Sequence, residues 1–510
     1  MALSPHHLGG LIESSLERHA DGEVLFFEGT WYRASAQLDR QRRLTGGLIA
    51  LGIRPGERVV VLMSNGPDVG VLYGAIWRAG AVVTPVVFLL TEVELRHVLT
   101  DSEAAAIVTT PEFLPKVVAA ADGIPTLRHI VLLGEAEGAS SVVPFEQLVR
   151  ADPADIVSRV DDDLGALMYT GGTTGRSKGV MLSHANLWWC GKASHEKGEA
   201  AGMDVSSSLV PLPLSHAFGM IVTIVGAHRQ GAGQATLMRW FDPVGWLQLA
   251  QDHRVEAAPL VPSMLTMLLQ QPLEEYDLSA LRFVNCGSAP LSVAALEEWE
   301  RRVPSSMVLN GYGCTESGAV ISTSTATQRK IGTVGTAIPY LELEIRDDDD
   351  QPLSAGEIGE VCVKSPGVMQ GYWNAPDVTA TTLRGGWLHT GDVGVVDEDG
   401  YLTLVDRKKD LIIRGGFNVY PVDVEDELMT HPSVAMAAVV GRPDPKMGEE
   451  VVAYVSLRPG TSATPEELVA YAKERLAANK YPREVHILDA IPLTSVGKTD
   501  RKALRQGLLQ

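Results

Sequence analysis

The chain has 510 residues, which is enough for about three folding units at roughly 150 residues per domain. Its residues are 45% hydrophobic and 21% charged, a globular composition that excludes disordered, collagen-like and coiled-coil proteins. The 63 acidic residues outnumber 43 Lys and Arg residues, and the net charge of −20 disfavours a generic binder of nucleic acid or anionic lipid. An anionic ligand would need a local cluster of amides, Lys or Arg.

The cysteines and the N-terminus indicate a reducing, cytoplasmic compartment. The cysteines are widely spaced without a C-x-x-C pair, which argues against a disulfide framework or zinc ribbon; they are Cys190, Cys286, Cys314 and Cys362. No basic region precedes an apolar run at the N-terminus, so we expect no signal peptide. The apolar stretch 70–90 contains Arg78 and Pro85, and it predicts a buried helix and a buried strand rather than a transmembrane segment.

Apolar strands and helical patterns alternate over much of the chain. The capping box Thr91-x-x-Glu94 opens one predicted helix, and Pro111 begins another. Strands are predicted at 59–63, 81–86, 105–109 and 129–133, and helices at 68–79, from 91, and at 111–121. A second such stretch, from about 207 to 310, has predicted strands at 208–211, 257–262 and 281–286. Strands separated by helices predict right-handed crossovers and doubly wound parallel sheets, an α/β fold.

The pattern changes after Gly332. Short strands with turn signals are predicted at 341–346, 359–363 and 394–396, which indicates a β-rich subdomain over about 332–405. The charged segment 406–410 is predicted to be an exposed boundary. A compact α+β tail follows, with a helix that begins at the capping box Thr464-Pro-Glu-Glu467. We therefore expect a large N-terminal domain (1–405), a hinge (406–410) and a small mobile C-terminal domain (411–510).

The segment from Tyr169 to Gly179, YTGGTTGRSKG, follows an apolar strand predicted at 164–168. Its glycines, hydroxyl groups and single Lys178 offer the backbone N–H groups, donors and positive charge that polyphosphate oxygens require. An ordinary flexible Gly/Thr turn has a similar composition. A Walker P-loop is excluded because Arg176 and Ser177 separate Gly175 from Lys178. The chain also lacks the G-x-G-x-x-G pattern of dinucleotide-binding folds.

Together with five later motifs, this segment resembles the adenylate-forming superfamily of acyl-CoA synthetases, adenylation domains and beetle luciferases. The later motifs are GYGCTES (311–317), HTGD (389–392), DRKKD (406–410), GGFNV (415–419) and PLTSVGK (492–498). The resemblance covers about residues 20–505. Its departures are Gly171 where the family often has Ser, Ser177 where it often has Pro, and Thr499 where an aliphatic residue is usual. None of them removes a charge or a ligand that the chemistry requires.

The resemblance implies a binding site for ATP and Mg²⁺. The segment from Thr170 to Lys178 would hold the β- and γ-phosphates, and Glu316 would coordinate Mg²⁺ through its hard carboxylate oxygen. Tyr312 would stack on adenine, and Asp392 would accept hydrogen bonds from the ribose hydroxyls. The implied ATP and AMP site comprises Thr170, Gly171, Gly172, Thr173, Thr174, Lys178, Ser288, Ala289, Pro290, Asn310, Gly311, Tyr312, Gly313, Thr315, Glu316, Asp392, Arg407 and Lys498.

The family pattern also implies an acyl pocket that begins at His216. Phe218, Gly219 and Met220 stand where amino-acid-activating relatives place an Asp, which argues against an amino-acid substrate. The implied pocket segments are 216–220, 285–290 and 313–320. They contain no Lys or Arg, which favours an aliphatic or aromatic monocarboxylic acid over a dicarboxylate. The implied pocket comprises His216, Phe218, Gly219, Met220, Gly287, Gly313 and Cys314.

The implied reaction has two steps. A carboxylate attacks the α-phosphorus of ATP, giving an acyl-adenylate and pyrophosphate, while Thr170, His216, Glu316 and Lys498 act in the catalytic site; Lys498 stabilises the charge that develops. A thiol then displaces AMP, on the side of Gly415 and Gly416. Lys498 must leave before the thiol enters, and Lys409 matches the family's hinge position.

Coenzyme A is the expected thiol co-substrate, with a carrier-protein phosphopantetheine as an open alternative. A luciferase-like oxygenase shares these motifs. A non-catalytic nucleotide-binding protein on the same fold is the alternative of another class, although Lys498 and Glu316 are both present. A simple ATPase is disfavoured by the missing Walker pattern.

Overall fold

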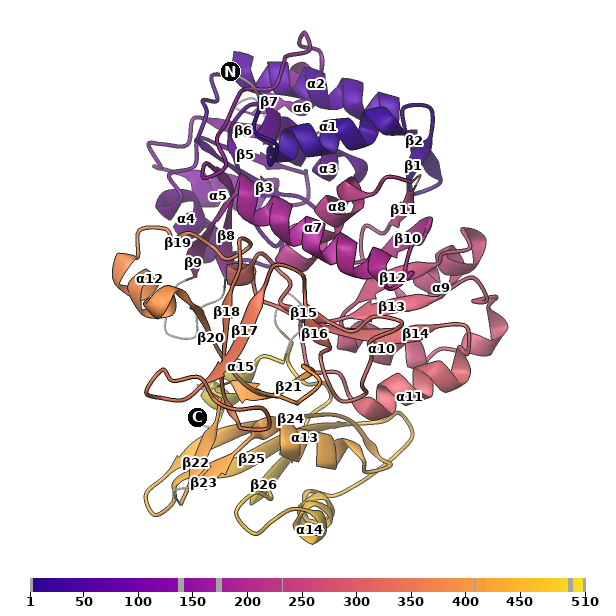
Figure 1. The fold of residues 1–510 in the computed structure, drawn as a ribbon, viewed down its shortest axis with the longest axis vertical. Coiled ribbons are helices and arrows are strands. Elements are labelled where there is room, and N and C mark those ends of the chain that lie inside the picture. The colour runs from indigo at the N-terminus through magenta and orange to yellow at the C-terminus, as the bar shows by residue number, and fades with distance from the viewer. Residues whose placement is uncertain are drawn as a thin grey trace.

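A computed structural model describes residues 3–135, 142–170, 177–231, 233–407, 410–415, 417–493 and 499–507. Within these ranges the strands form four sheets. Figure 1 shows the first half of the chain, in indigo and magenta, above a smaller C-terminal region in yellow, with the orange β-rich region between them in this view. The predicted α/β class, with a large sheet-containing domain and a small C-terminal domain, is confirmed.

The first sheet has the strand order β19-β9-β8-β4-β3-β5-β6-β7 among the described residues. It is parallel from β8 to β7, whereas β9 and β19 are antiparallel additions. Its strands are β3 (Arg58–Leu62), β4 (Val82–Pro85), β5 (Ala106–Thr109), β6 (His129–Leu132), β7 (Val143–Pro144), β8 (Leu164–Thr170), β9 (Lys178–Ser183) and β19 (Gly371–Tyr372). The strands predicted from the sequence in this region are present to within one or two residues.

The second sheet has the order β16-β15-β14-β13-β12-β10-β11-β1-β2. Parallel strands form its centre, and β2, β15 and β16 pair antiparallel at its ends. Its strands are β1 (Glu23–Phe27), β2 (Thr30–Arg33), β10 (Ser207–Val210), β11 (Gln234–Leu237), β12 (Ala257–Leu260), β13 (Phe283–Cys286), β14 (Met307–Tyr312), β15 (Ser322–Thr323) and β16 (Thr336–Ala337).

Helices connect and cover the two large sheets. They are α1 (Leu8–Arg18), α2 (Ala34–Ala50), α3 (Pro67–Arg78), α4 (Glu92–Asp101), α5 (Leu114–Ala121), α6 (Phe145–Val149), α7 (His184–Ala200), α8 (Ala217–His228), α9 (Pro243–Asp252), α10 (Pro262–Leu269) and α11 (Val293–Arg302), with the short helices η1 (Leu273–Glu275) and η2 (Thr315–Ser317). Helix α1 contacts both α3 and α8, so helices from the two sheets share one hydrophobic core.

The segment 70–90 folds as predicted, into most of α3 and then β4. Among the described helices, none combines the length and the hydrophobicity needed to cross a bilayer. The predicted helix at 111–121 begins later, at Leu114. The N–H groups of Phe113 and Leu114 bond the carbonyls of Thr110 and Pro111 in a turn, and Pro115 rather than Pro111 stands in the first helical turn.

The β-rich sheet is antiparallel with the order β17-β18-β20-β21. Its strands are β17 (Glu342–Arg346), β18 (Gly359–Lys364), β20 (Leu388–Val396) and β21 (Leu402–Arg407), and α12 (Pro376–Thr382) and η3 (Arg384–Gly386) precede β20. The strand predicted at 394–396 is therefore only the end of a longer strand. The Thr-Gly-Asp sequence at 390–392 lies inside that strand, as an irregularity in its pairing with β18.

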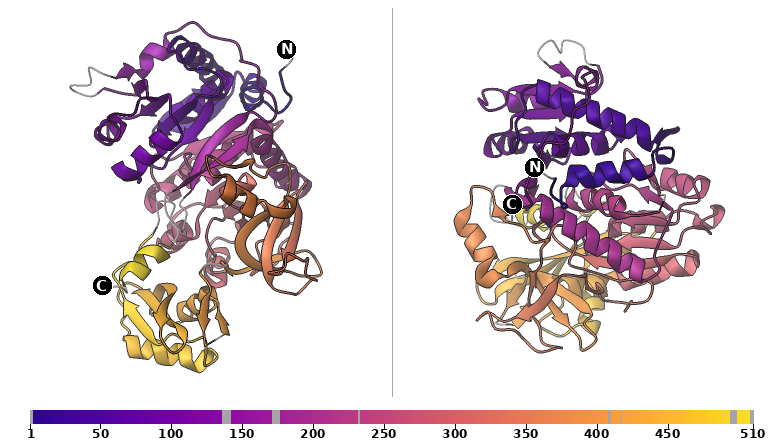
Figure 2. Two further views of the ribbon diagram at one scale, coloured as in Figure 1. Left: turned by 90° about the vertical axis from the view of Figure 1, so that its left-hand side faces the viewer. Right: turned by 45° about the horizontal axis from the view of Figure 1, so that its top comes forward.

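The C-terminal sheet has the order β23-β22-β25-β24, with β26 paired to β25. Its elements are β22 (Ile412–Arg414), β23 (Phe417–Val419), α13 (Pro421–Met429), β24 (Val434–Asp444), β25 (Gly448–Leu457), α14 (Pro465–Arg475), β26 (Glu484–Ile487) and α15 (Arg501–Gly507). The predicted capping box between Thr464 and Glu467 is present at the start of α14. In Figure 1 and in the left view of Figure 2, α15 lies on the side of this region that faces the rest of the chain.

The prediction that the segment 406–410 is exposed is wrong for both of its acidic ends. Asp406 is 8% exposed and Asp410 is 7% exposed. Asp406 accepts a hydrogen bond from the N–H of Val422 in the first turn of α13, where the helix dipole favours a carboxylate. Asp410 accepts one from Arg505 of α15 across 2.8 Å. Tertiary partners therefore compensate charges that the sequence alone places in solvent. Lys408 and Lys409 lie outside the described residues.

Candidate functional site

The side chains of Tyr312 and Asp392 meet between two different sheets. Tyr312 ends β14, and Asp392 lies in β20. The Tyr312 hydroxyl donates a hydrogen bond to Asp392 Oδ2 across 2.6 Å. Burial, followed by the charge of Asp392, raises the pKa of Tyr312 well above its usual value, so the hydroxyl keeps the proton that it donates. The predicted adenine-stacking and ribose-binding residues are thus adjacent.

Glu316 lies just beyond, in the short helix η2. Its Oε1 accepts a hydrogen bond from the hydroxyl of Tyr372 across 2.9 Å. The Nζ atom of Lys178 lies 5.5 Å from the centre of the Tyr372 ring, within the range of a cation–π contact. Tyr372 of β19 therefore contacts two residues of the predicted site, Glu316 of η2 and Lys178 of β9. Tyr372 carries no motif of its own and was not predicted from the sequence.

The predicted phosphate-binding segment connects two antiparallel strands. Thr170 ends β8, Lys178 begins β9, and the two residues pair across the ladder. Strand β9 was not predicted from the sequence. The segment 171–176, which includes the predicted residues Gly171, Gly172, Thr173 and Thr174, lies outside the described residues.

Helix α4 supports both ends of this segment. The Tyr169 hydroxyl donates to Asp101 Oδ2 across 2.6 Å, and His97 Nε2 lies 2.9 Å from the carbonyl oxygen of Ser177. The capping box of Thr91 and Glu94 fixes the start of the same helix, as predicted. Helix α4 is therefore part of the framework that holds Thr170 and Lys178.

The predicted acyl-pocket residues converge at the start of α8 and the end of β13. A Cβ atom added to Gly287 would lie 3.8 Å from the Phe218 ring and 3.0 Å from the carbonyl oxygen of Gly311. At Gly313 such an atom would lie only 1.9 Å from the carbonyl oxygen of Ala319, so no side chain fits there. Gly287 is therefore closely packed between Phe218 and Gly311, and glycine is required at Gly313 because of Ala319.

The other predicted pocket residues have structural partners. His216 caps α8, and its Nδ1 accepts a hydrogen bond from the N–H of Phe218 across 3.3 Å. Gly219 packs against the carbonyl oxygen of Pro213, and Met220 is buried in the main core. Cys314 is partly buried directly after Gly313. Met220 therefore acts here as a core residue.

Other residues of the implied ATP and AMP site lie at the ends of the parallel strands β13 and β14. Ser288, Ala289 and Pro290 come directly after β13, and Ser288 has a φ of 73°, a left-handed conformation that is uncommon outside glycine. Asn310 and Gly311 lie in β14, and Thr315 opens η2. The carboxyl edge of such a sheet is where ligands of open α/β folds bind.

The structure describes only some of the predicted site residues in the C-terminal part of the chain. Arg407 pairs with Asp392 in the ladder between β21 and β20. Lys498, Lys409 and Gly416 lie outside the described residues, whereas Gly415 has a φ of 60° at the β22–β23 hairpin. Leu493 and Thr499 bridge across the segment that contains Lys498. Figure 1 places this hairpin farther from the large sheets than α15.

Helix α15 is joined to helix α13 of the same C-terminal region. Arg501 donates two hydrogen bonds to the Glu425 carboxylate, at 2.7 and 2.8 Å. An open cavity of about 710 Å³ lies between β26 and α15, lined by Val485, Leu488 and Leu504 among others. Of the predicted site residues that the structure describes, none lines this cavity. The convergence of Tyr312, Asp392 and their neighbours therefore defines the candidate site.

Two family models match the chain. The model described as AMP-binding enzyme matches residues 12–373, and the model described as AMP-binding enzyme C-terminal domain matches residues 423–498.

Similar proteins are known by sequence and by structure. A feruloyl-CoA synthase from Amycolatopsis sp is 38% identical, over 92% of this chain and 93% of that protein. A medium/long-chain-fatty-acid–CoA ligase, FadD8, from Mycobacterium tuberculosis is 33% identical, over 98% of this chain and 90% of that protein. The solved structure of an amide bond synthetase, McbA, from Marinactinospora thermotolerans is 31% identical with a TM-score of 0.86, and covers 97% of this chain and 99% of that one.

Proposed function

Because the chain belongs to the AMP-binding enzyme family, we propose that it is an ATP-dependent carboxylate–CoA ligase that forms an acyl-adenylate and then an acyl-CoA thioester. The family match confirms the resemblance to the adenylate-forming superfamily that the six motifs predicted, and with it an AMP-forming ligase. The observation that carries the proposal is the convergence of Tyr312 with Asp392, and of Lys178 with Tyr372 and Glu316, at the edges of the large sheets.

In this proposal Asp392 accepts hydrogen bonds from the ribose hydroxyls. A carboxylate offers about four lone-pair positions, so Asp392 accepts from Tyr312 and from the ribose together. The ring of Tyr312 packs on the adenine while its hydroxyl fixes the carboxylate. Segment 288–290, Asn310 and Gly311 line the same nucleotide site.

The phosphates lie between the β8–β9 segment and η2. Thr170 and Lys178 bring a hydroxyl donor and a positive charge to the β- and γ-phosphates. Glu316 is a hard oxygen ligand, held in place by Tyr372, which suits Mg²⁺. When bound with ATP, Mg²⁺ neutralises charge on the phosphates during transfer. Lys498 approaches the α-phosphate from the C-terminal domain and stabilises the charge of the attack.

The acid is a monocarboxylic acid, aliphatic or aromatic. Phe218 gives the proposed pocket an apolar ring beside Gly287, and Gly313 allows the backbone to pass close to the carbonyl of Ala319. The implied pocket segments contain no Lys or Arg that would pair with a second carboxylate. The similar proteins are named for both acid classes: one for the aromatic feruloyl group and another for aliphatic fatty acids.

Coenzyme A is the proposed acceptor in the second step. A carrier-protein thiol presents the same reactive group, and an amine is the alternative suggested by the similar amide bond synthetase. Lys498 leaves the site between the two steps by a rotation of the C-terminal domain about Lys409.

The acceptor test supplies ATP, a panel of ferulic, benzoic and fatty acids, and one of three acceptors: CoA, a holo carrier protein or a primary amine. We expect AMP and an acyl-CoA thioester with CoA. Release of ADP would contradict the adenylation step, and product only with the carrier protein or the amine would contradict the CoA assignment. ATP binding without any turnover would favour the non-catalytic alternative.

A further inference from the structure

Strand β20 carries Asp392 in a bulge. Glu360 and Cys362 of β18 pair with Val393 and His389 of β20, so three residues of β20, Thr390 to Asp392, lie opposite the single residue Val361. A bulge interrupts the ladder and re-aims a side chain, and bulges are common beside active sites. This bulge turns Asp392 toward Tyr312.

The interrupted ladder leaves backbone groups that need other partners. The N–H of Gly391, which has a φ of 73°, donates to Glu360 Oε1 across 3.1 Å. The N–H of Asp392 donates to the Thr390 hydroxyl, which itself donates to the carbonyl of Val361 across 2.8 Å. The side chain of Glu360 therefore replaces a missing ladder bond directly before Asp392.

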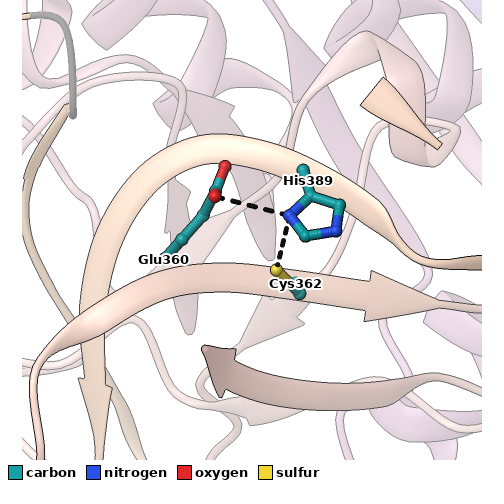
Figure 3. Close-up of side chains that lie close together, drawn as sticks. All are labelled: Glu360, Cys362 and His389. Atoms are coloured by element: carbon teal, nitrogen blue, oxygen red, sulfur yellow. Dashed lines mark hydrogen bonds and ion pairs between the residues drawn. The ribbon is translucent and has the colours of Figure 1, made fainter. Parts of the chain in front are cut away.

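Glu360 is itself held in place on its other oxygen. Its Oε2 lies 3.4 Å from His389 Nδ1 and 3.3 Å from Arg384 Nη2, and the residue is only 6% exposed. His389 Nδ1 also lies 3.2 Å from Cys362 Sγ (Figure 3). A buried carboxylate with such partners has one orientation, which suits a rigid support.

The same three side chains are a candidate metal site. The ligand atoms of Glu360, Cys362 and His389 lie within 4.8 Å of one another. However, the Arg384 guanidinium contacts the carboxylate oxygen nearest to His389, and a positive group there opposes a cation. Burial and the charge of Glu360 also raise the pKa of the Cys362 thiol to about 12, which keeps it protonated. These features favour a hydrogen-bonded support over a metal centre.

We propose that Glu360 is a positioning residue for nucleotide binding, because it holds the bulge from Thr390 to Asp392 in the shape that aims Asp392 at the ribose. This inference rests on the proposed function, in which Asp392 binds the ribose hydroxyls. The inference requires that a carboxylate oxygen of Glu360 reach the Gly391 N–H. It does not depend on the negative charge of Glu360.

The experiment separates reach from charge with two conservative variants. Glu360→Asp keeps the charge but withdraws the carboxylate by about 1.5 Å, the length of one C–C bond. Glu360→Gln keeps the reach and an acceptor oxygen but removes the charge. Arg384→Ala is the matched control, since it removes a partner of Glu360 without touching the bulge. Calorimetry measures the affinity of each for MgATP and for Mg-2′,3′-dideoxy-ATP, which lacks both ribose hydroxyls.

We expect the wild type to prefer ATP by at least about 10-fold, since a hydrogen bond to a charged group contributes about 1.5–3 kcal/mol. Glu360→Asp should lose most of this preference while its affinity for dideoxy-ATP stays unchanged. Glu360→Gln and Arg384→Ala should keep it. Equal weakening of both nucleotides, with the preference intact in Glu360→Asp, would overturn the inference, and so would stoichiometric zinc in the purified wild type.

Failure of the proposed function has a different signature. A wild type that shows no preference between the two nucleotides would overturn the role of Asp392 itself, and the positioning role with it. A wild type that prefers ATP, together with a Glu360→Asp variant that also prefers it, would overturn only the role of Glu360.

Discussion

The hydroxyl of Tyr372 donates a hydrogen bond to Glu316 Oε1 across 2.9 Å and so joins strand β19 to the helix that follows β14. Burial and the charge of Glu316 raise the pKa of Tyr372, which keeps the phenol protonated as the donor. The family motif that contains Glu316 does not include Tyr372. In the proposed function Tyr372 orients the carboxylate that binds Mg²⁺.

We therefore expect Tyr372→Phe to raise the Mg²⁺ concentration that half-saturates adenylation by about 10-fold or more, because loss of such an orienting partner typically costs 10–100-fold in metal affinity. A magnesium titration of the reaction measures this. Tyr340→Phe is the matched control, since the exposed Tyr340 hydroxyl bonds Glu196 across 2.8 Å, away from the site residues. An identical magnesium response in both variants would contradict the role of Tyr372.

Lys498→Ala should separate the two half-reactions. Removal of a donor that stabilises developing charge costs on the order of 10²–10³ in rate. Adenylation should fall by that amount, whereas transfer of a synthetic acyl-adenylate to CoA should be kept. Lys502→Ala, a change at an exposed lysine of α15, is the control. Equal losses in both half-reactions would contradict a role of Lys498 that is specific to adenylation.

Lys409→Pro should have the opposite effect. Proline fixes φ near −65° and blocks a large backbone rotation at the proposed hinge. Adenylation should persist while thioester formation is lost, and Lys409→Ala should retain both. The hinge assignment is wrong if the proline variant loses both half-reactions equally or loses neither.

His184 should make the protein sensitive to acid. Burial, followed by the charge of His7, lowers the pKa of His184 from 6.5 to about 3, and its Nδ1 accepts a hydrogen bond from the N–H of Leu8 across 3.2 Å. Because the folded state resists protonation, the unfolded state binds more protons below pH 6.5. The free energy of unfolding therefore falls as the pH drops from 6.5, by about 3 kcal/mol at pH 4.

His184→Asn tests this pH dependence. The Asn side-chain oxygen can accept the Leu8 N–H but does not titrate. The free energy of unfolding of wild type and variant, measured by denaturant titration between pH 7 and pH 4, should therefore diverge, with the wild type losing more. Parallel pH curves would show that His184 does not contribute.

Local patterns predicted much of the fold. The capping boxes at Thr91 and Thr464 and the strands beside them depend on neighbours in sequence, and they occur as expected. The β1–β2 hairpin was missed because its turn, Glu28–Gly29, has positive φ at both residues but lacks the Asn or Asp that signals such a turn.

The site was predicted as a set of residues but not as an arrangement. Glu316 and Tyr372 are 56 residues apart and meet only because β19 pairs with β9. The bulge at Asp392 depends on Glu360 of a neighbouring strand, and the burial of Asp406 depends on α13. Such contacts between distant segments leave no periodic signal in the sequence. The domain boundaries and the cytoplasmic location stay predictions.

The most direct test of the proposed function is carboxylate-dependent exchange of labelled pyrophosphate into ATP, measured with ferulic, benzoic and fatty acids and with amino acids. It reports the first step alone, whatever the acceptor. We predict exchange with at least one monocarboxylic acid and none with the amino acids, and loss of that exchange in Lys498→Ala. An absence of exchange with every acid, while ATP still binds, would contradict the assignment of the chain as an active carboxylate-adenylating ligase.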